Sequence, residues 1–339
     1  MCYYKFTTKN GSDNMAYSRD YFVSEKNYKD TMINTVEPFL DEKRNDGYFE
    51  ALDGKKIHYV FYKADMPKAS ITVAHGFTES TEKFREMTYY FLKMGLNVFL
   101  LDHRGHGLSH RHNDDPEVIH IKYFDQYVDD LHSYVKKVVR PNSEGLPLYL
   151  YSHSMGGAVS VRHMQKHPGV FEKAVLSAPM IKARTAGLPG SVVSFLSRTF
   201  ILLGKEKSKV IGYKGFDPGR TYEESHDTSE ERFKYYHQKR IENTCYQTAA
   251  PSYRWVNEAV MISKKLLDGK RNSVIKAKVL LCQPEEDSSV YSDVQDDFIK
   301  TVNGGRLVSF TKCKHEIYMS VDETVKEYLD TIEDFLFNE

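Results

Sequence analysis

The sequence predicts an α/β protein with a mostly parallel central sheet flanked by helices, and with a mainly helical insertion. Short apolar segments alternate with segments of helical periodicity from about residue 48 onward, which is typical of strands buried on both faces. Ligand sites in such sheets lie beyond the carboxyl ends of the strands. Roughly 100 residues separate the strand ending near Ser177 from the next one, and a segment of that length must hold structure of its own.

Composition excludes several classes of protein. The 339 residues contain 47 Lys and Arg against 47 Asp and Glu, so the formal net charge is zero. This balance argues against a nucleic-acid partner, because such binding needs a clustered cationic excess. The 24 tyrosines and 19 phenylalanines supply ample apolar area, which excludes disorder over most of the chain.

Residues 1–45 are predicted to form an N-terminal extension, without strong strand character, that packs on the body. Met1 to Asn10 lacks a basic segment followed by an apolar run, so we expect no signal peptide. Ser24 to Leu40 is predicted as one amphipathic helix that begins after Ser24 and ends near Pro38.

Cysteine use and hydropathy bear on location. The chain has no C-x-x-C pair, which argues against a zinc ribbon or a redox motif and fits a reducing compartment. The most apolar window, Leu188 to Leu203, is short for a bilayer span and contains Arg198. We therefore expect a cytoplasmic protein, with peripheral membrane association as the further alternative.

The α/β core is predicted over residues 46–179 and 251–339. An Asp53-Gly54 turn precedes the first strand, and β-branched or aromatic residues mark the strands themselves. They are predicted at Lys55 to Tyr62, Ser70 to Ala74, Leu96 to Leu101, Leu148 to Tyr151, Lys173 to Leu176, Lys278 to Cys282 and Arg306 to Phe310.

Helices are predicted between these strands, and glycine or proline marks several of their ends. Gly95 follows the first, Pro141 the second and Pro168 the third. The helices are predicted at Phe84 to Met94, Ile121 to Val139, Met155 to His167, Tyr253 to Leu267, Ser292 to Val302 and Val321 to Phe337.

Residues 180–250 are predicted to form an inserted cap, or lid, over the carboxyl ends of the strands. Its apolar stretch from Val192 to Leu203 is interpreted as the lining of an acyl-chain tunnel or as a membrane contact, with the cap's own packing as the plainer alternative. The tract from Glu223 to Arg240 is dense in charge and is interpreted as a solvated helix face.

A candidate nucleophile follows the strand Leu148 to Tyr151. Ser154 lies between that strand and a helix, where a serine must adopt a strained backbone that exposes its hydroxyl. Residues two before and two after it must be small, which Gly156 satisfies, while Ser152 replaces the glycine of the usual motif. The alternative is a helix N-cap serine followed by two packing glycines.

A serine hydroxyl needs a base and an orienting carboxylate. His315 follows the last predicted strand, and an acidic run follows the strand before it. Asp287 is the favoured acid, Glu286 is the second choice, and the remaining charges would be solvated. Alone, His315 would be a surface histidine, but the order Ser, Asp, His is that of α/β-hydrolases.

An oxyanion formed in acyl transfer needs backbone donors. The amide of Met155, directly after Ser154, is one candidate. The other is the amide of Phe77 in the turn after the strand Ser70 to Ala74, where Gly76 permits the bend. An ordinary tight turn at this place is compatible with that function.

At this point a family resemblance adds to the pattern. The elbow Ser152 to Ala158 resembles that of the α/β-hydrolase branch containing bacterial lysophospholipases and monoacylglycerol lipases, a serine aminopeptidase-like hydrolase domain. Leu101 to Ser109 is similar to that branch's Asp-x-Arg-Gly-x-Gly-x-Ser loop. Further segments also look like bacterial members: His167 to Val170, Ser177 to Met180, Pro251 to Val256, Gln283 to Asp287 and Lys314 to Ile317.

The resemblance covers the chain from about residue 48 onward and is weakest in the cap. It implies an α/β-hydrolase fold with Ser154, Asp287 and His315 as the catalytic triad, and hydrolases of this type need no cofactor. It also implies that Asp102 and Arg104 brace the loop in which they lie. Four histidines in or next to that loop invite a metal interpretation: His103, His106, His110 and His112. We set it aside because a loop interrupted by glycines does not hold a helical i, i+4 pair of ligands.

The sequence thus predicts a serine hydrolase of carboxylic esters, most consistent with a lysophospholipase or monoacylglycerol lipase acting on a small ester with an acyl chain. A short-chain esterase and an amidase or peptidase are the alternatives within enzymes. A dehalogenase or epoxide hydrolase is disfavoured because Ser154 replaces their aspartate. The rival from another class is a catalytically silent binding module, and the oligomeric state stays open.

Overall fold

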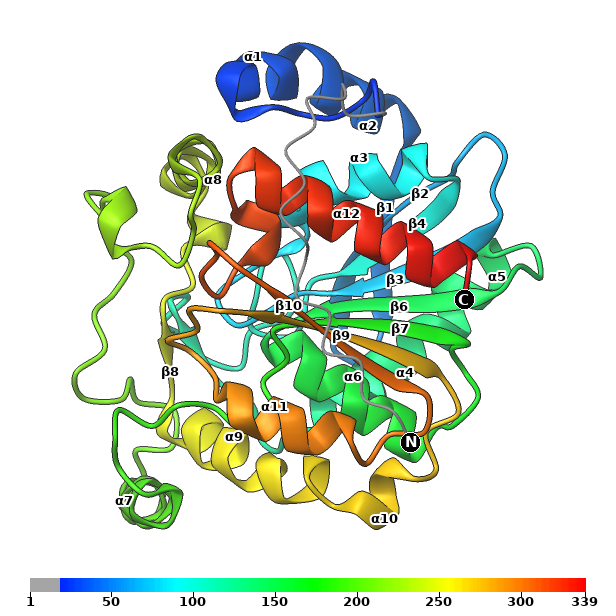
Figure 1. Ribbon diagram of the computed structural model, residues 1–339. Helices are drawn as coiled ribbons and strands as arrows, with labels where there is room; N and C mark the ends of the chain where they lie inside the picture. The colour runs from blue at the N-terminus through cyan, green and yellow to red at the C-terminus, as the bar shows by residue number, and fades with distance from the viewer. Residues whose placement is uncertain (1–18) are drawn as a thin grey trace.

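A computed structural model describes residues 19–339 (Figure 1). The expectation for Met1 to Asn10 lies outside the described residues. The central sheet has eight strands in the order β1-β2-β4-β3-β6-β7-β9-β10. Their bounds are β1 Arg44–Glu50, β2 Lys56–Tyr62, β3 Ala69–Ala74, β4 Leu96–Leu101, β6 Leu148–His153, β7 Lys173–Ser177, β9 Lys278–Pro284 and β10 Gly305–Phe310.

The six strands from β4 to β10 in that order run parallel, and β2 runs antiparallel to both of its neighbours, so the sheet is mostly parallel as predicted. Every residue of β3, β4 and β6 is buried. Continuous apolar strands of this kind require helices on both faces.

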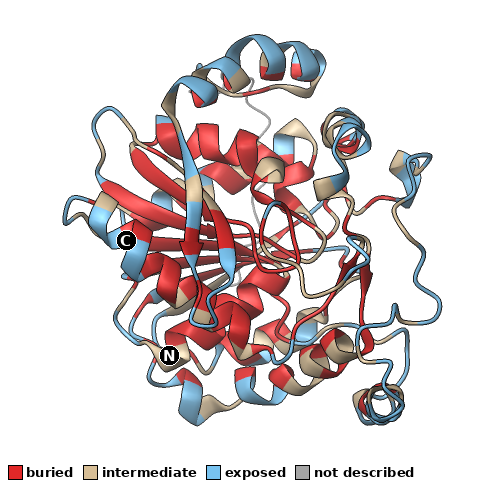
Figure 2. Ribbon diagram, turned by 180° about the vertical axis from the view of Figure 1, so that it is seen from behind, coloured by how far each residue is buried: buried red, intermediate tan, exposed pale blue. Residues whose placement is uncertain are grey.

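Helices cover both faces of the sheet (Figure 1). On one side lie α3, Arg85–Lys93, and α12, Asp322–Phe337, with the N-terminal helices beyond them. On the other side lie α4 Asp125–Tyr134, α6 Met155–Lys166, α9 Tyr253–Leu266 and α11 Ser292–Ile299. Each layer closes its own hydrophobic cluster against the sheet. Figure 2 shows buried residues along the strands and along the helices that cover them.

Strand β1 was not predicted. It carries mostly polar residues, and Phe49 is its one buried side chain. As an edge strand it pairs on one side, with β2, so its sequence needs no continuous apolar pattern. Residues 1–45 were predicted to lack strong strand character, yet β1 begins within them, at Arg44.

Two predicted helix ends, each placed at a proline, are also wrong. The N-terminal helix runs through η1 Glu25–Asn27, α1 Tyr28–Thr31, η2 Met32–Val36 and α2 Glu37–Lys43, past the end predicted near Pro38. Similarly, α4 continues through η4 Val135–Val139 and α5 Arg140–Asn142, past Pro141.

In both helices a π-turn comes just before the proline. The amide before each proline bonds five residues back, from Glu37 to Met32 and from Arg140 to Val135. This wider turn relieves the clash between a proline ring and the preceding turn of an α-helix. The proline then stands at the start of the next helical segment, where its missing N–H costs little.

Between β7 and α9 the chain forms the two larger helices of the insertion, α7 Gly190–Leu202 and α8 Glu230–Glu242. They lie apart in Figure 1, with β8 Ala250–Pro251 between them and paired to β5 Val118–Ile119. Short helices complete the described chain: η3 Thr81–Phe84, η5 Tyr222–Glu224, η6 Thr244–Tyr246, α10 Gly269–Asn272 and η7 Ile317–Met319.

The interpretation of Glu223 to Arg240 as a solvated face is wrong at Arg232. This side chain is fully buried, because it points from α8 into the junction between the insertion, the N-terminal extension and the body. Across residues 19–339, none of the helices combines the length and apolar character needed to cross a bilayer.

Candidate active site

Ser154 occupies the sharp turn between β6 and α6, with φ 51° and ψ −116°. A positive φ is unfavourable for serine and persists where the surroundings enforce it. The close approach of the backbone is measurable at Gly156, where an added Cβ would lie 2.1 Å from the carbonyl oxygen of Ala74. Ser152, two residues before Ser154, is fully buried. Small residues are therefore required around this turn.

A continuous hydrogen-bond chain runs from Ser154 to Asp287. The Oγ of Ser154 lies 2.8 Å from Nε2 of His315, and Nδ1 of His315 lies 2.8 Å from Oδ2 of Asp287. The neighbouring Glu285 and Glu286 are exposed. Of the three acids that follow β9, Asp287 is thus the one in contact with the imidazole.

The second oxygen of Asp287 accepts hydrogen bonds from the amides of Ser289, at 2.7 Å, and Val290, at 3.0 Å. Burial alone would raise the pKa of Asp287, but the hydrogen bond from His315 and these two amides hold the pKa below its usual value. The carboxylate is therefore ionised and favours a proton on Nδ1 of His315. That tautomer leaves Nε2 free to accept the hydroxyl proton of Ser154.

The loop after β3 passes beside Ser154. A Cβ added at Gly76 would lie 3.2 Å from Cβ of Ser154, so glycine allows this close approach. The next residue, Phe77, packs its ring on Trp255 with 4.2 Å between the centroids, and both line the cavity above Ser154. The amide of Phe77, which follows Gly76, and that of Met155, the first residue of α6, therefore belong to two segments that adjoin Ser154.

A cavity of about 1040 Å³ opens above Ser154 and His315. Much of its wall is apolar and comes from α7 and α9. The apolar residues include Val193, Leu196, Phe200, Trp255, Val256 and Val260. The stretch from Val192 to Leu203 was interpreted as tunnel lining or membrane contact. One side of it faces the cavity, while Phe195 and Leu202 on the other side are exposed to solvent.

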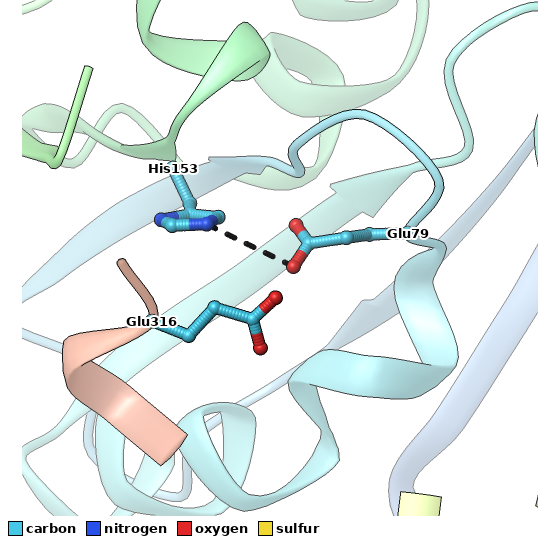
Figure 3. Close-up of side chains that lie close together, drawn as sticks. All are labelled: Glu79, His153 and Glu316. Carbon is cyan, nitrogen blue, oxygen red and sulfur yellow. Dashed lines mark ion pairs between the residues drawn. The ribbon is translucent and has the colours of Figure 1, made fainter. Parts of the chain in front are cut away.

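A buried cluster of titratable groups that the sequence did not predict lies next to His315, with Glu79, His153 and Glu316 side by side (Figure 3). Glu79, His153 and Glu316 bring potential ligand atoms within 4.8 Å of one another. The ammonium of Lys83 is paired with both carboxylates, at 3.1 Å from Glu79 and in closer contact with Glu316. A lysine cation is therefore already paired with both carboxylates and offsets one of their two negative charges.

His153 stays neutral in this cluster. Burial lowers its pKa to about 4, against the opposing pull of Glu79, and its ring lies 4.8 Å from that of His315. The signal for this cluster was in the sequence, because His153 precedes Ser154 and Glu316 follows His315. Lys83 gave no such signal, since it lies on a helical turn away from the motifs.

The loop after β4 is braced as the resemblance implied. Asp102 accepts hydrogen bonds from the amides of Thr81, at 2.7 Å, and Leu108, at 3.1 Å. Arg104 pairs with Asp130 at 2.6 Å and with Asp53 at 2.9 Å. The loop is thus tied to the body by charged groups at its base.

Comparison with known proteins assigns the chain to a family. Residues 65–322 match the family model described as serine aminopeptidase, S33. The chain belongs to this family of hydrolases.

Relatives of the chain include a lysophospholipase and a monoglyceride lipase. Lysophospholipase L2 of Escherichia coli strain K12 is 28% identical over 319 residues, which span 89% of this chain and 90% of that protein. Human monoglyceride lipase is 32% identical over 144 residues, 42% of this chain and 44% of that one.

Among solved structures, a soluble variant of monoglyceride lipase from Saccharomyces cerevisiae in complex with a substrate analog superposes with a TM-score of 0.71. The match has 17% identity and covers 87% of this chain and 96% of that one. A thermostable carboxyl esterase from Bacillus coagulans gives a TM-score of 0.70, also at 17% identity. The predicted α/β-hydrolase fold is confirmed, and the chain is an ester hydrolase of that fold.

Proposed function

We propose that this S33-family hydrolase cleaves the ester bond of single-chain lipids, such as lysophospholipids or monoacylglycerols. In this proposal Ser154 is the nucleophile, His315 the general base and Asp287 the carboxylate that orients the imidazole. The observation that carries the proposal is the unbroken hydrogen-bond chain through these three residues at the floor of a large cavity with apolar walls.

The proposed reaction proceeds through an acyl-enzyme. Nε2 of His315 takes the proton of Ser154 as Oγ attacks the ester carbonyl, and Asp287 stabilises the imidazolium that results. The amides of Phe77 and Met155 donate hydrogen bonds to the oxyanion. His315 then protonates the departing alcohol. A water molecule, deprotonated by the same imidazole, attacks the acyl-enzyme and releases the fatty acid.

The cavity supports an acyl chain as the apolar part of the substrate. Its volume of about 1040 Å³ is at the upper end of the ~300–1000 Å³ usual for sites that enclose one small molecule. Aliphatic and aromatic side chains of α7 and α9 form the wall opposite the triad. In this proposal residues 180–250 act as a cap that shields the acyl chain from water.

The outer side of α7 supports contact with a lipid surface as part of the same proposal. Phe195 is 70% exposed and Leu202 is 87% exposed, although both are large apolar residues. Exposed lysines follow the helix closely, at Lys205, Lys207 and Lys209. Apolar side chains bordered by cations suit the interface of an anionic membrane, from which single-chain lipids would enter the cavity.

The test compares fatty-acid release from monooleoylglycerol and from lysophosphatidylcholine with hydrolysis of p-nitrophenyl butyrate. We expect wild-type protein to release oleate and the Ser154→Ala variant to lose all three activities. Hydrolysis of the short ester alone would retain the triad and refute the lipid substrate. Failure of a fluorophosphonate probe to label Ser154 in folded protein would favour a silent binding module instead.

A further inference from the structure

The two carboxylates paired with Lys83 belong to two different catalytic loops. The carboxylate of Glu79 accepts a hydrogen bond from the amide of Gly76 at 2.5 Å, and Gly76 directly precedes Phe77. Glu316 directly follows His315. Lys83 therefore links the loop that presents the Phe77 amide to the loop that presents the imidazole. Figure 3 shows the two glutamates that it joins.

The link is deeply enclosed. The side chains of Lys83 and Glu79 are 7% and 4% exposed. The hydroxyl of Tyr318 donates to Glu79 at 2.5 Å, and the rings of Tyr236 and Tyr318 flank the ammonium. The ammonium and the two carboxylates are all paired in this arrangement, and this pairing specifies the separation of the two loops.

The insertion adds a third carboxyl group. Asp227 is buried, and its carboxyl group is hydrogen-bonded to Glu316. Burial and the charge of Glu316 raise the pKa of Asp227 well above its usual value, which favours its protonated form. Lys83 is the cation paired with both Glu79 and Glu316.

We propose that Lys83 is a positioning residue for the hydrolysis, because its ammonium sets the distance between the Phe77 amide and the His315 imidazole. The inference rests on the proposed function, since it assigns the roles of Phe77 and His315 given there. Stability alone gives no reason for this pairing, because burying charges costs desolvation energy and a well-packed apolar side chain often serves as well. What a charged link adds is a defined geometry.

The experiment measures kcat and KM for p-nitrophenyl butyrate in Lys83→Met, which keeps a long unbranched side chain and removes the charge. We expect kcat to fall about 30-fold with KM nearly unchanged, since sub-ångström misplacement of reacting groups carries penalties of this order. Lys83→Arg should restore kcat to within about 3-fold of wild type, because a guanidinium can pair with both carboxylates.

Lys234→Met is the matched control. Lys234 also pairs with two glutamates, Glu230 and Glu231, but on the exposed side of α8, so its removal should leave kcat unchanged. If Lys83→Met does not fold, Glu316→Gln breaks the same link and should give the same loss of kcat.

Two outcomes would overturn the proposal: an unchanged kcat in a folded Lys83→Met variant, or a loss of kcat that Lys83→Arg does not restore. Failure of the proposed function looks different. In that case the wild-type protein itself would neither turn over the ester nor react with a fluorophosphonate at Ser154.

Discussion

Helices α7 and α8 belong to the same insertion, yet they are attached to the body in different ways. Helix α8 is bonded through Arg232, which donates to Glu86 of α3 at 3.0 Å and to the carbonyl oxygens of Val23 and Ser320 at 2.9 Å. Helix α7 packs on α9, and large apolar side chains on its other side remain in solvent. One helix is held by buried charge, and the other by apolar contact on a single face.

The two attachments suit α7 and α8 to different roles within the insertion. The partner of Arg232 is itself saturated, because the hydroxyls of Tyr28 and Tyr90 each donate to Glu86 at 2.7 Å. A fully satisfied buried network specifies one position for α8. Apolar packing is less directional, so α7 is the part of the wall that can adjust to a substrate or a lipid surface.

The largest effect should come from breaking the α8 attachment. Arg232→Met leaves the Glu86 carboxylate buried without its cation, which typically costs about 3–5 kcal/mol of unfolding free energy. Urea denaturation followed by far-UV circular dichroism measures the change. Arg198→Met on the exposed side of α7 is the matched control and should shift the unfolding free energy by no more than about 0.5 kcal/mol. Equal losses in the two variants would contradict the comparison.

A smaller effect should appear at the exposed face of α7. Leu202→Ser is expected to weaken binding to phosphatidylcholine–phosphatidylglycerol vesicles by about 2 kcal/mol, roughly 30-fold, because one leucine side chain no longer enters the interface. Cosedimentation of the protein with the vesicles measures this binding. Met66→Ser is the control, since Met66 is 86% exposed and Leu202 is 87% exposed, but Met66 lies in the loop between β2 and β3. Equal losses of binding would show that general surface hydrophobicity, and not α7, meets the membrane.

The buried parallel strands could be predicted from sequence because most of their residues are apolar. The order of Ser154, Asp287 and His315 along the chain was also readable, since each follows one of those strands. Local patterns failed at an edge strand and at a proline that a π-turn accommodates. Strand β1 pairs along one edge and has a polar sequence, and a π-turn carries the N-terminal helix past Pro38.

Buried charges were the least predictable feature. Arg232 and Lys83 lie in sequence segments that are dense in charged residues, so each is predicted locally to be solvated. What buries Arg232 is a set of partners between 88 and 209 positions away along the chain. No periodicity within α8 encodes such partners, and only the assembled fold identifies them.

The smallest predicted change in unfolding free energy concerns the N-termini of α7 and α8. Ser229 caps α8, accepts the amide of Arg232 and donates to Glu25 of the N-terminal extension at 2.6 Å. Helix α7 begins after Pro189, which makes no side-chain cap. Ser229→Ala should therefore cost about 1 kcal/mol of unfolding free energy.

The matched change on α7 is Ser191→Ala, at an exposed position that makes no cap, where we expect a shift within about 0.5 kcal/mol. Both values come from the same urea titrations. If Ser191→Ala were as costly as Ser229→Ala, the start of α7 would be as firmly attached as that of α8. The contrast between the two helices would then be confined to Arg232. A loss confined to Ser229→Ala would instead show that α8 is attached to the N-terminal extension from its first residue, while α7 depends on its packing against α9.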